Sequence, residues 1–184
     1  MEPTEGIEIR MEDCRWTAID LGTIARRAHK AVCGELGLGP ETPGFAVLAT
    51  DDATLARLNG RFRGEARATD ILSWPASGER AGTTGFRPED VDDRGQDHGP
   101  SGPWHWSGSL GDIAMSFETC AGEAARVDTT LENHVTHLLI HGILHLLGFD
   151  HATGTEVRNM RAIETSALAK LGVGDPYRSN TTTG

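Results

Sequence analysis

The chain has 184 residues, and its 17 Lys and Arg against 27 Asp and Glu give a formal net charge of -10. This length suits a single domain with its own core, and the acidic balance excludes a protein that binds polyanions through a broad cationic face. Any contact with nucleic acid must therefore be local.

Apolar periodicity predicts strands and helices through the first half of the chain. We expect a short strand at 7–10 and then a helix that ends at Gly37, with Thr17 and Asp20 resembling a capping box at its start. A buried strand is predicted at 44–50, followed by a short helix, capped by Asp51 or Asp52, that ends near residue 59. A third strand covers 71–74.

The segment 76–108 differs in composition from the rest of the chain. Its 33 residues hold seven Gly and three Pro, which predicts a mobile insertion with no fold of its own. A fourth strand at 110–116 follows, then a helix at 117–127, a helix that reaches residue 147 and an amphipathic helix that ends near residue 171. We expect one catalytic domain over 1–171 and a flexible tail over 172–184.

These elements predict an α+β domain in which a mixed sheet of about four strands packs with about five helices. The three cysteines form no Cys-x-x-Cys pair, which is typical of reduced thiols. Neither a signal peptide nor a membrane span is recognisable in the sequence. We therefore expect a cytoplasmic protein with no membrane partner.

Three histidines near the end of the fourth predicted helix carry the main chemical signal. Side chains at His141 and His145 lie four residues apart and share one helix face, and Gly148 suits a bend that brings His151 to the same point. Three imidazoles with one open position are typical of a catalytic zinc site. The sequence therefore predicts one Zn²⁺ ion bound on a zincin-like metal helix.

Other polar residues near this motif have several possible roles. His134 and His137 extend the histidine stripe, and Asp150 precedes the last histidine; they would orient the ligands, face the substrate or form a solvated turn and helix face. Zincin peptidases place a glutamate base directly after the first histidine, where this chain has Gly142. This substitution argues against a standard peptidase.

The chain resembles the YbeY-type endoribonucleases, which are bacterial factors of ribosomal RNA maturation. The resemblance rests on four blocks in the same order: 58–63 (LNGRFR), 69–75 (TDILSWP), 110–113 (LGDI) and 141–151 (HGILHLLGFDH). Two features depart from the family pattern. Phe149 stands where the family usually has Tyr, and 76–108 is longer than the usual connection.

The resemblance implies a metal-dependent endoribonuclease that cuts single-stranded RNA in ribosomal RNA precursors. It implies a role at the 3′ end of 16S rRNA, in ribosome quality control and in contact with the ribosome or its small subunit. By position, His141, His145 and His151 would bind zinc, and Arg63 would be the functionally important arginine. The catalytic residues would then be Arg63 and His141.

A cluster of arginines independently supports RNA binding. Arg57, Arg61, Arg63 and Arg67 lie within eleven residues, and guanidinium groups bind phosphate and stack on unpaired bases. A solvated face of a short helix and loop is the alternative interpretation of these arginines. The general base stays unassigned between metal-activated water and the ribose 2′-hydroxyl. A zinc-stabilised ribosome assembly factor that does not cut, and a zinc hydrolase of another substrate such as a peptide, remain alternatives.

Overall fold

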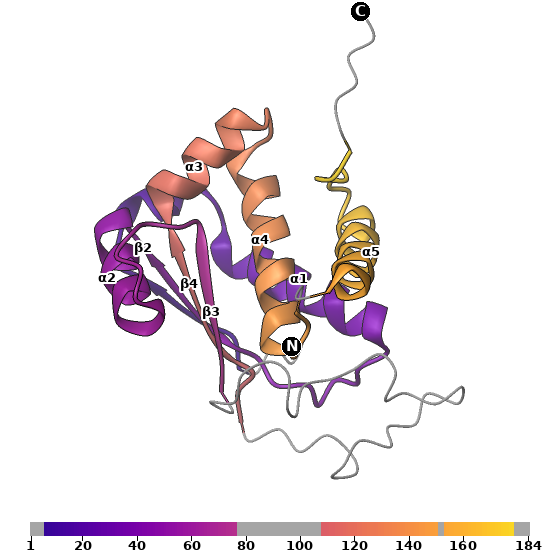
Figure 1. Ribbon diagram of the computed structural model, residues 1–184. Coiled ribbons are helices and arrows are strands. Elements are labelled where there is room, and N and C mark those ends of the chain that lie inside the picture. Colours follow the sequence, from indigo (N-terminus) through magenta and orange to yellow (C-terminus); the bar gives the residue numbers. More distant parts are fainter. Residues whose placement is uncertain (1–5, 77–107, 151–152, 179–184) are drawn as a thin grey trace, which may run out of the picture.

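The computed structural model describes residues 6–76, 108–150 and 153–178 (Figure 1). Within these residues it contains four strands, one 3-10 helix and five α-helices. In chain order they are β1 (Glu8–Met11), η1 (Cys14–Ala18), α1 (Leu21–Leu36), β2 (Ala46–Thr50), α2 (Asp52–Arg63), β3 (Ile71–Pro75), β4 (Gly111–Ser116), α3 (Phe117–Arg126), α4 (Leu131–Leu146) and α5 (Gly154–Lys170). The predicted α+β class is confirmed.

The four strands form one mixed sheet in the order β1-β2-β4-β3. The first three run parallel, whereas β3 pairs antiparallel with β4, with Leu72 opposite Ala114. Because β3 is last in this order, it forms an edge of the sheet.

Alternation along β4 distributes its side chains between two hydrophobic clusters. Ile113 and Met115 belong to the large core that includes residues of α1 and α4, whereas Ala114 packs with Leu55 of α2 and Leu72 of β3. Helix α2 therefore covers one face of the sheet, and α1 and α4 cover the other (Figure 1). Helix α5 packs on α1 and α4, away from the sheet.

Two predicted helix boundaries were wrong. Thr17 does not cap α1, because it lies inside η1. The neighbouring Trp16 is fully buried and donates from Nε1 to the Thr50 carbonyl at 2.9 Å. Asp20 alone caps α1, by accepting from the Thr23 N–H. Helix α2 continues to Arg63 instead of ending near residue 59. Its Gly60 is a packing position, since a Cβ there would lie 3.3 Å from that of Ala66, and a left-handed Gly64 ends the helix.

The structure describes only the ends of the predicted insertion, because residues 77–107 lie outside the described ranges. The first part of the expected tail is described and does contact the domain. The chain turns at Gly172, where φ is 73°, and Val173 donates to the Leu168 carbonyl at 3.0 Å. Tyr177 then returns to α5.

The three cysteines are free thiols, as expected. Among the described residues, no helix combines the length and the apolar character needed to cross a membrane.

Candidate metal centre

The two histidines of the helical motif meet near the C-terminal end of α4. The buried neighbours Ile140, Ile143 and Leu144 anchor this helix in the core, which leaves His141 and His145 partly exposed on another face. Their Nε2 atoms lie 2.9 Å apart. The predicted convergence of these two side chains is therefore present in the structure.

The other ring nitrogens determine which tautomers the two histidines adopt. Nδ1 of His141 lies 2.6 Å from the Oε1 atom of Glu164, and Nδ1 of His145 lies 2.9 Å from the carbonyl oxygen of Phe149. Because both partners are acceptors, each Nδ1 must carry the proton. Each ring then turns its other nitrogen, Nε2, toward the other ring.

Two Nε2 atoms this close need a cation between them, either a proton or a metal ion. Two nitrogens bound to one tetrahedral zinc ion at about 2.0–2.1 Å lie about 3.3–3.4 Å apart, so a small outward rotation of the two rings from their 2.9 Å separation would accommodate the ion. Hydrogen bonds from Nδ1 to a carboxylate and a carbonyl are typical of metal-binding histidines. The donor set therefore fits a zinc ion.

The third predicted ligand, His151, lies outside the described residues. Gly148 adopts φ 94°, which agrees with the predicted left-handed bend after α4. Within 6–76, 108–150 and 153–178, no group of three or more His, Cys, Asp or Glu side chains is arranged to hold a metal. The assignment of His151 stays a prediction.

Glu164 is a site residue that the sequence analysis missed. Its side chain is only 1% exposed, on α5, where it occupies a core position between Met160 and Leu168. Burial alone would raise the pKa of Glu164, but hydrogen bonds with His141 and Tyr177, together with the nearby His137, lower its pKa to about 2. An acidic residue at a core position of an amphipathic helix was the available signal.

The other polar residues predicted around the motif divide between two environments. His137 joins the Glu164 cluster, since its Nε2 lies 3.9 Å from Oε2 of Glu164 and 3.4 Å from the Tyr177 hydroxyl. Burial lowers the pKa of His134, and its Nε2 has no hydrogen-bond partner among the described residues. Asp150 is half-buried at the end of the described segment. Their roles stay predictions.

Gly142 faces the sheet and not the histidine pair. A Cβ at this position would lie 2.9 Å from Ile113, 3.0 Å from Ile71 and 3.1 Å from Ser73. A side chain at position 142 would therefore point at β3 and β4, away from the histidine pair, unlike the glutamate that zincin peptidases carry at this place in their motif.

The predicted arginine cluster is exposed, as a phosphate-binding surface requires. Three of its members, Arg57, Arg61 and Arg63, lie on α2, and Arg67 lies in the loop that follows. Arg57 donates to Thr54 Oγ1 at 2.9 Å, and Arg67 pairs with Glu65 at 3.0 Å. Because α2 and α4 cover opposite faces of the sheet, the structure does not bring the arginine cluster and the histidine pair together on one face.

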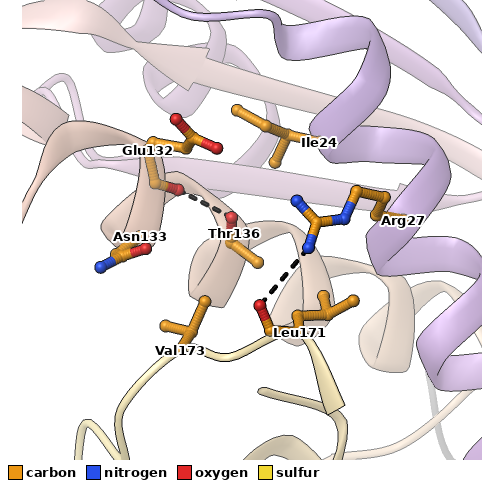
Figure 2. Close-up of a pocket in the computed structure, with 7 residues that line it drawn as sticks. All are labelled: Ile24, Arg27, Glu132, Asn133, Thr136, Leu171 and Val173. Carbon is orange, nitrogen blue, oxygen red and sulfur yellow. Dashed lines mark hydrogen bonds between the residues drawn. The ribbon is translucent and has the colours of Figure 1, made fainter. Parts of the chain in front are cut away.

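A small pocket lies elsewhere on the molecule, between α1, the start of α4 and the chain after α5 (Figure 2). Arg27 crosses it and donates to the Leu171 carbonyl at 3.4 Å. The lining residues are Ile24, Arg27, Glu132, Asn133, Thr136, Leu171 and Val173. None of the predicted site residues lines this pocket.

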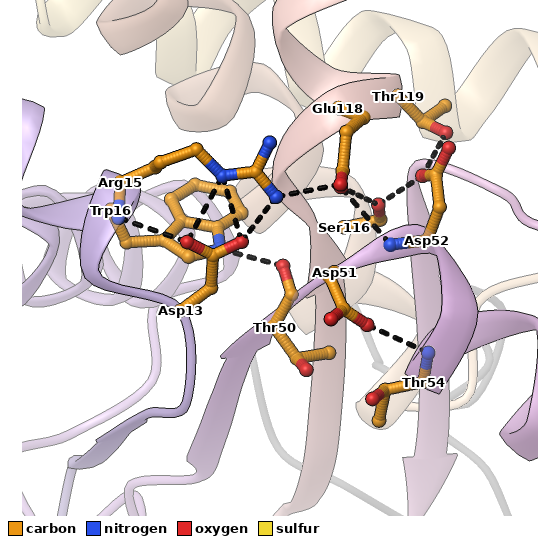
Figure 3. A network of polar contacts seen from close by, with 10 residues as sticks. All are labelled: Asp13, Arg15, Trp16, Thr50, Asp51, Asp52, Thr54, Ser116, Glu118 and Thr119. Atoms are coloured by element: carbon orange, nitrogen blue, oxygen red, sulfur yellow. Dashed lines mark hydrogen bonds and ion pairs between the residues drawn. The ribbon is translucent and has the colours of Figure 1, made fainter.

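A polar network lies where β2 and β4 end (Figure 3). Arg15 donates to Asp13 at 2.5 Å and to Glu118 at 2.6 Å, and Glu118 accepts from the backbone N–H of Asp52 at 3.0 Å. Asp52 also accepts from the hydroxyls of Ser116 and Thr119. These contacts join η1 to the starts of α2 and α3, so this acidic cluster has a structural explanation.

Comparison with known proteins settles the relationship that the motifs suggested. The family model described as Endoribonuclease YbeY matches residues 7–172. The chain belongs to the YbeY endoribonuclease family. Endoribonuclease YbeY of Dinoroseobacter shibae is 42% identical over 94% of this chain and 91% of its own length, and that of Cereibacter sphaeroides is 42% identical over 96% and 100%.

The YbeY assignment confirms the resemblance that the four sequence blocks carried. The solution structure of TM1509 from Thermotoga maritima covers 94% of this chain and 99% of its own, with a TM-score of 0.50 and 20% identity. At this identity the likeness supports the fold alone. The range matched by the family model, residues 7–172, includes the arginine cluster and the histidine motif.

Proposed function

We propose that this chain is a zinc-dependent endoribonuclease that cuts single-stranded RNA in ribosomal RNA precursors. The observation that carries the proposal is the pair of Nε2 atoms that face each other at 2.9 Å on a chain of the YbeY endoribonuclease family. Maturation of the 16S rRNA 3′ end and ribosome quality control are the roles we propose, in contact with the small subunit. Such a substrate, together with free cysteines, fits the cytoplasm.

Each residue of the proposed site has a defined task. His141 and His145, with His151, would hold the ion, while Glu164 and the Phe149 carbonyl keep the first two rings in the correct tautomer. When bound, zinc supplies Lewis acidity toward phosphate oxygens and water. By the family resemblance, Arg63 would bind the reacting phosphate and balance the negative charge that grows on it during cleavage, although α2 and the histidine pair lie on opposite faces of the sheet.

Gly142 has no side chain that could act as a base, so the proton acceptor differs from that of a zincin peptidase. Either water or the ribose 2′-hydroxyl would attack the phosphorus. The products separate the two routes: attack by the 2′-hydroxyl leaves a 2′,3′-cyclic phosphate, whereas direct hydrolysis does not.

Metal analysis combined with an RNA-cleavage assay tests the proposal. We expect His141→Ala and His145→Ala to lose both bound zinc and cleavage of a single-stranded precursor, because each removes one ligand. Arg158→Ala, which changes an exposed arginine of α5, should keep both. If the zinc-saturated wild type binds ribosomes but leaves precursor RNA intact, the protein is an assembly factor and the enzymatic proposal is wrong.

A further inference from the structure

Glu164 brings an ionised group into the interior beside the proposed metal ligands. One carboxylate oxygen, Oε1, lies 2.6 Å from Nδ1 of His141, and the other, Oε2, accepts a hydrogen bond from the hydroxyl of Tyr177. A buried carboxylate is costly unless its oxygens are hydrogen-bonded. Both oxygens of Glu164 meet this requirement, and each partner lies at or next to the proposed metal centre.

Tyr177 reaches this position because the chain reverses after α5. The turn at Gly172 directs the following residues back along the helix, and the backbone N–H of Tyr177 donates to Asp175 Oδ1 at 2.9 Å. The guanidinium of Arg161 lies over the tyrosine ring, 4.7 Å from its centroid. Tyr177 is thus held at its backbone, at its ring and at its hydroxyl.

His137 closes the same cluster from α4. Its ring lies edge-on to Tyr177, with ring centroids 5.7 Å apart, and edge-on to His141 at 6.5 Å. The carboxylate of Glu164 therefore lies among side chains of α4, α5 and the returning C-terminal segment. This carboxylate contacts the ring of His141, whose other nitrogen, Nε2, faces the proposed metal position.

We propose that Glu164 and Tyr177 are positioning residues of the metal centre. Glu164 keeps the proton of His141 on Nδ1, which leaves Nε2 unprotonated to bind the metal. Tyr177 fixes the second oxygen of Glu164. The inference rests on the proposed function in one respect, namely that His141 binds the ion. It adds that residues 173–178, which follow the last helix, help to complete the site.

Zinc affinity, measured by competition with a chromophoric chelator, tests this inference without any cleavage assay. We expect Glu164→Gln to weaken binding about 10-fold to 100-fold, which is the loss typical of residues that hydrogen-bond a metal-binding histidine. Tyr177→Phe should weaken it less. If Tyr177 acts through Glu164, the double variant should bind little worse than Glu164→Gln alone.

Controls separate positioning from general stability. Glu132→Gln, an exposed change on α4, should bind zinc as the wild type does. Tyr177 is 38% exposed, so Tyr177→Phe remains a folded test should Glu164→Gln fail to fold. The absorption bands of bound Co²⁺ should shift in both variants, which a change in stability alone would not produce.

The outcomes distinguish this inference from the proposed function. Variants that melt at lower temperature without metal, yet bind zinc with wild-type affinity and an unchanged Co²⁺ spectrum, would show that the cluster only ties α4 to α5. Losses that add in the double variant would show that Tyr177 does not act through Glu164. A wild type that binds no zinc would overturn the proposed metal site and this inference together.

Discussion

Arg63 is the residue whose role rests most on sequence and least on a contact in the structure. It is the last residue of α2, exposed, and directly followed by the left-handed Gly64. A basic side chain in the last turn also interacts favourably with the helix dipole, so its position alone has a structural explanation. Its proposed catalytic role therefore needs a test that separates cleavage from folding.

We predict that Arg63→Ala lowers the single-turnover cleavage rate about 100-fold to 1000-fold, the usual cost of removing one donor to a developing charge. Zinc content should not change, because α2 and α4 lie on opposite faces of the sheet. Arg63→Lys should recover part of the rate, since lysine keeps the charge but not the forked geometry. Rates and metal content are measured on the same preparations.

Arg57→Ala is the matched comparison within the cluster. Arg57 lies on the same helix, and its guanidinium donates to Thr54 Oγ1. We expect Arg57→Ala to weaken RNA binding more than it slows the cleavage step. Equal effects of both substitutions on the rate at saturating RNA would mean that the cluster attracts RNA by charge alone, with no catalytic task for Arg63.

At the scale of elements, the network around Arg15 determines how η1, α2 and α3 meet. The hydrogen bond from Arg15 lowers the pKa of Glu118 below its usual range. Burial would raise the pKa of Asp52, but bonds from Ser116 and Thr119 outweigh it and lower that pKa as well. Both carboxylates therefore hold their protons less tightly in the folded protein than in the unfolded chain.

These shifts predict a loss of stability in acid. Because the folded pKa values are depressed, the contribution of the network is complete above the unfolded values, about 4 to 4.5, and declines as the pH falls through the folded ones. Glu118→Gln should lower the free energy of unfolding at pH 6 by less than about 1 kcal/mol, since the pair with Arg15 is partly exposed. That difference should shrink at pH 3.

Urea denaturation at several pH values measures this dependence. Glu132→Gln controls for the removal of an exposed glutamate elsewhere on the surface. A difference between wild type and Glu118→Gln that stays constant from pH 6 to pH 3 would show that Glu118 contributes by packing and not as an ionised partner of Arg15.

Element by element, local signals in the sequence predicted most of the fold. Asp20 and Gly37 border α1 as capping chemistry requires, and the strands follow apolar runs. The errors arose where a contact outside the element decided the boundary. Ala66 packs against Gly60 inside α2, and the buried Trp16 holds η1 where a capping box was expected.

For the whole molecule, the sequence predicted ligands but not the residues that hold them. His141 and His145 were recognisable because their spacing is local. Glu164 comes from the next helix, and Tyr177 from a segment expected to be a flexible tail, so only the tertiary arrangement brings them together. The contact between His141 and Glu164 joins residues 23 positions apart, and that between Glu164 and Tyr177 joins residues 13 positions apart.

The proposed metal centre joins α4, α5 and the returning C-terminal segment, so metal binding should stabilise the whole domain. A ligand that binds only the folded state at 100 times its dissociation constant adds about 2.7 kcal/mol. For a domain of this size, that corresponds to a rise in melting temperature of about 5–10 °C. We predict a rise of this order when Zn²⁺ is added to the metal-free protein, and its reversal by a chelator.

Calorimetric scans with and without zinc measure the shift within each protein, which cancels any effect of a substitution on the metal-free fold. His145→Ala should show almost no shift, because a single remaining nitrogen of the facing pair cannot hold the ion as tightly. Arg63→Ala should shift as the wild type does, since Arg63 lies on the opposite face of the sheet. A wild-type melting temperature that ignores both zinc and chelator would mean that the facing nitrogens share a proton and not a metal.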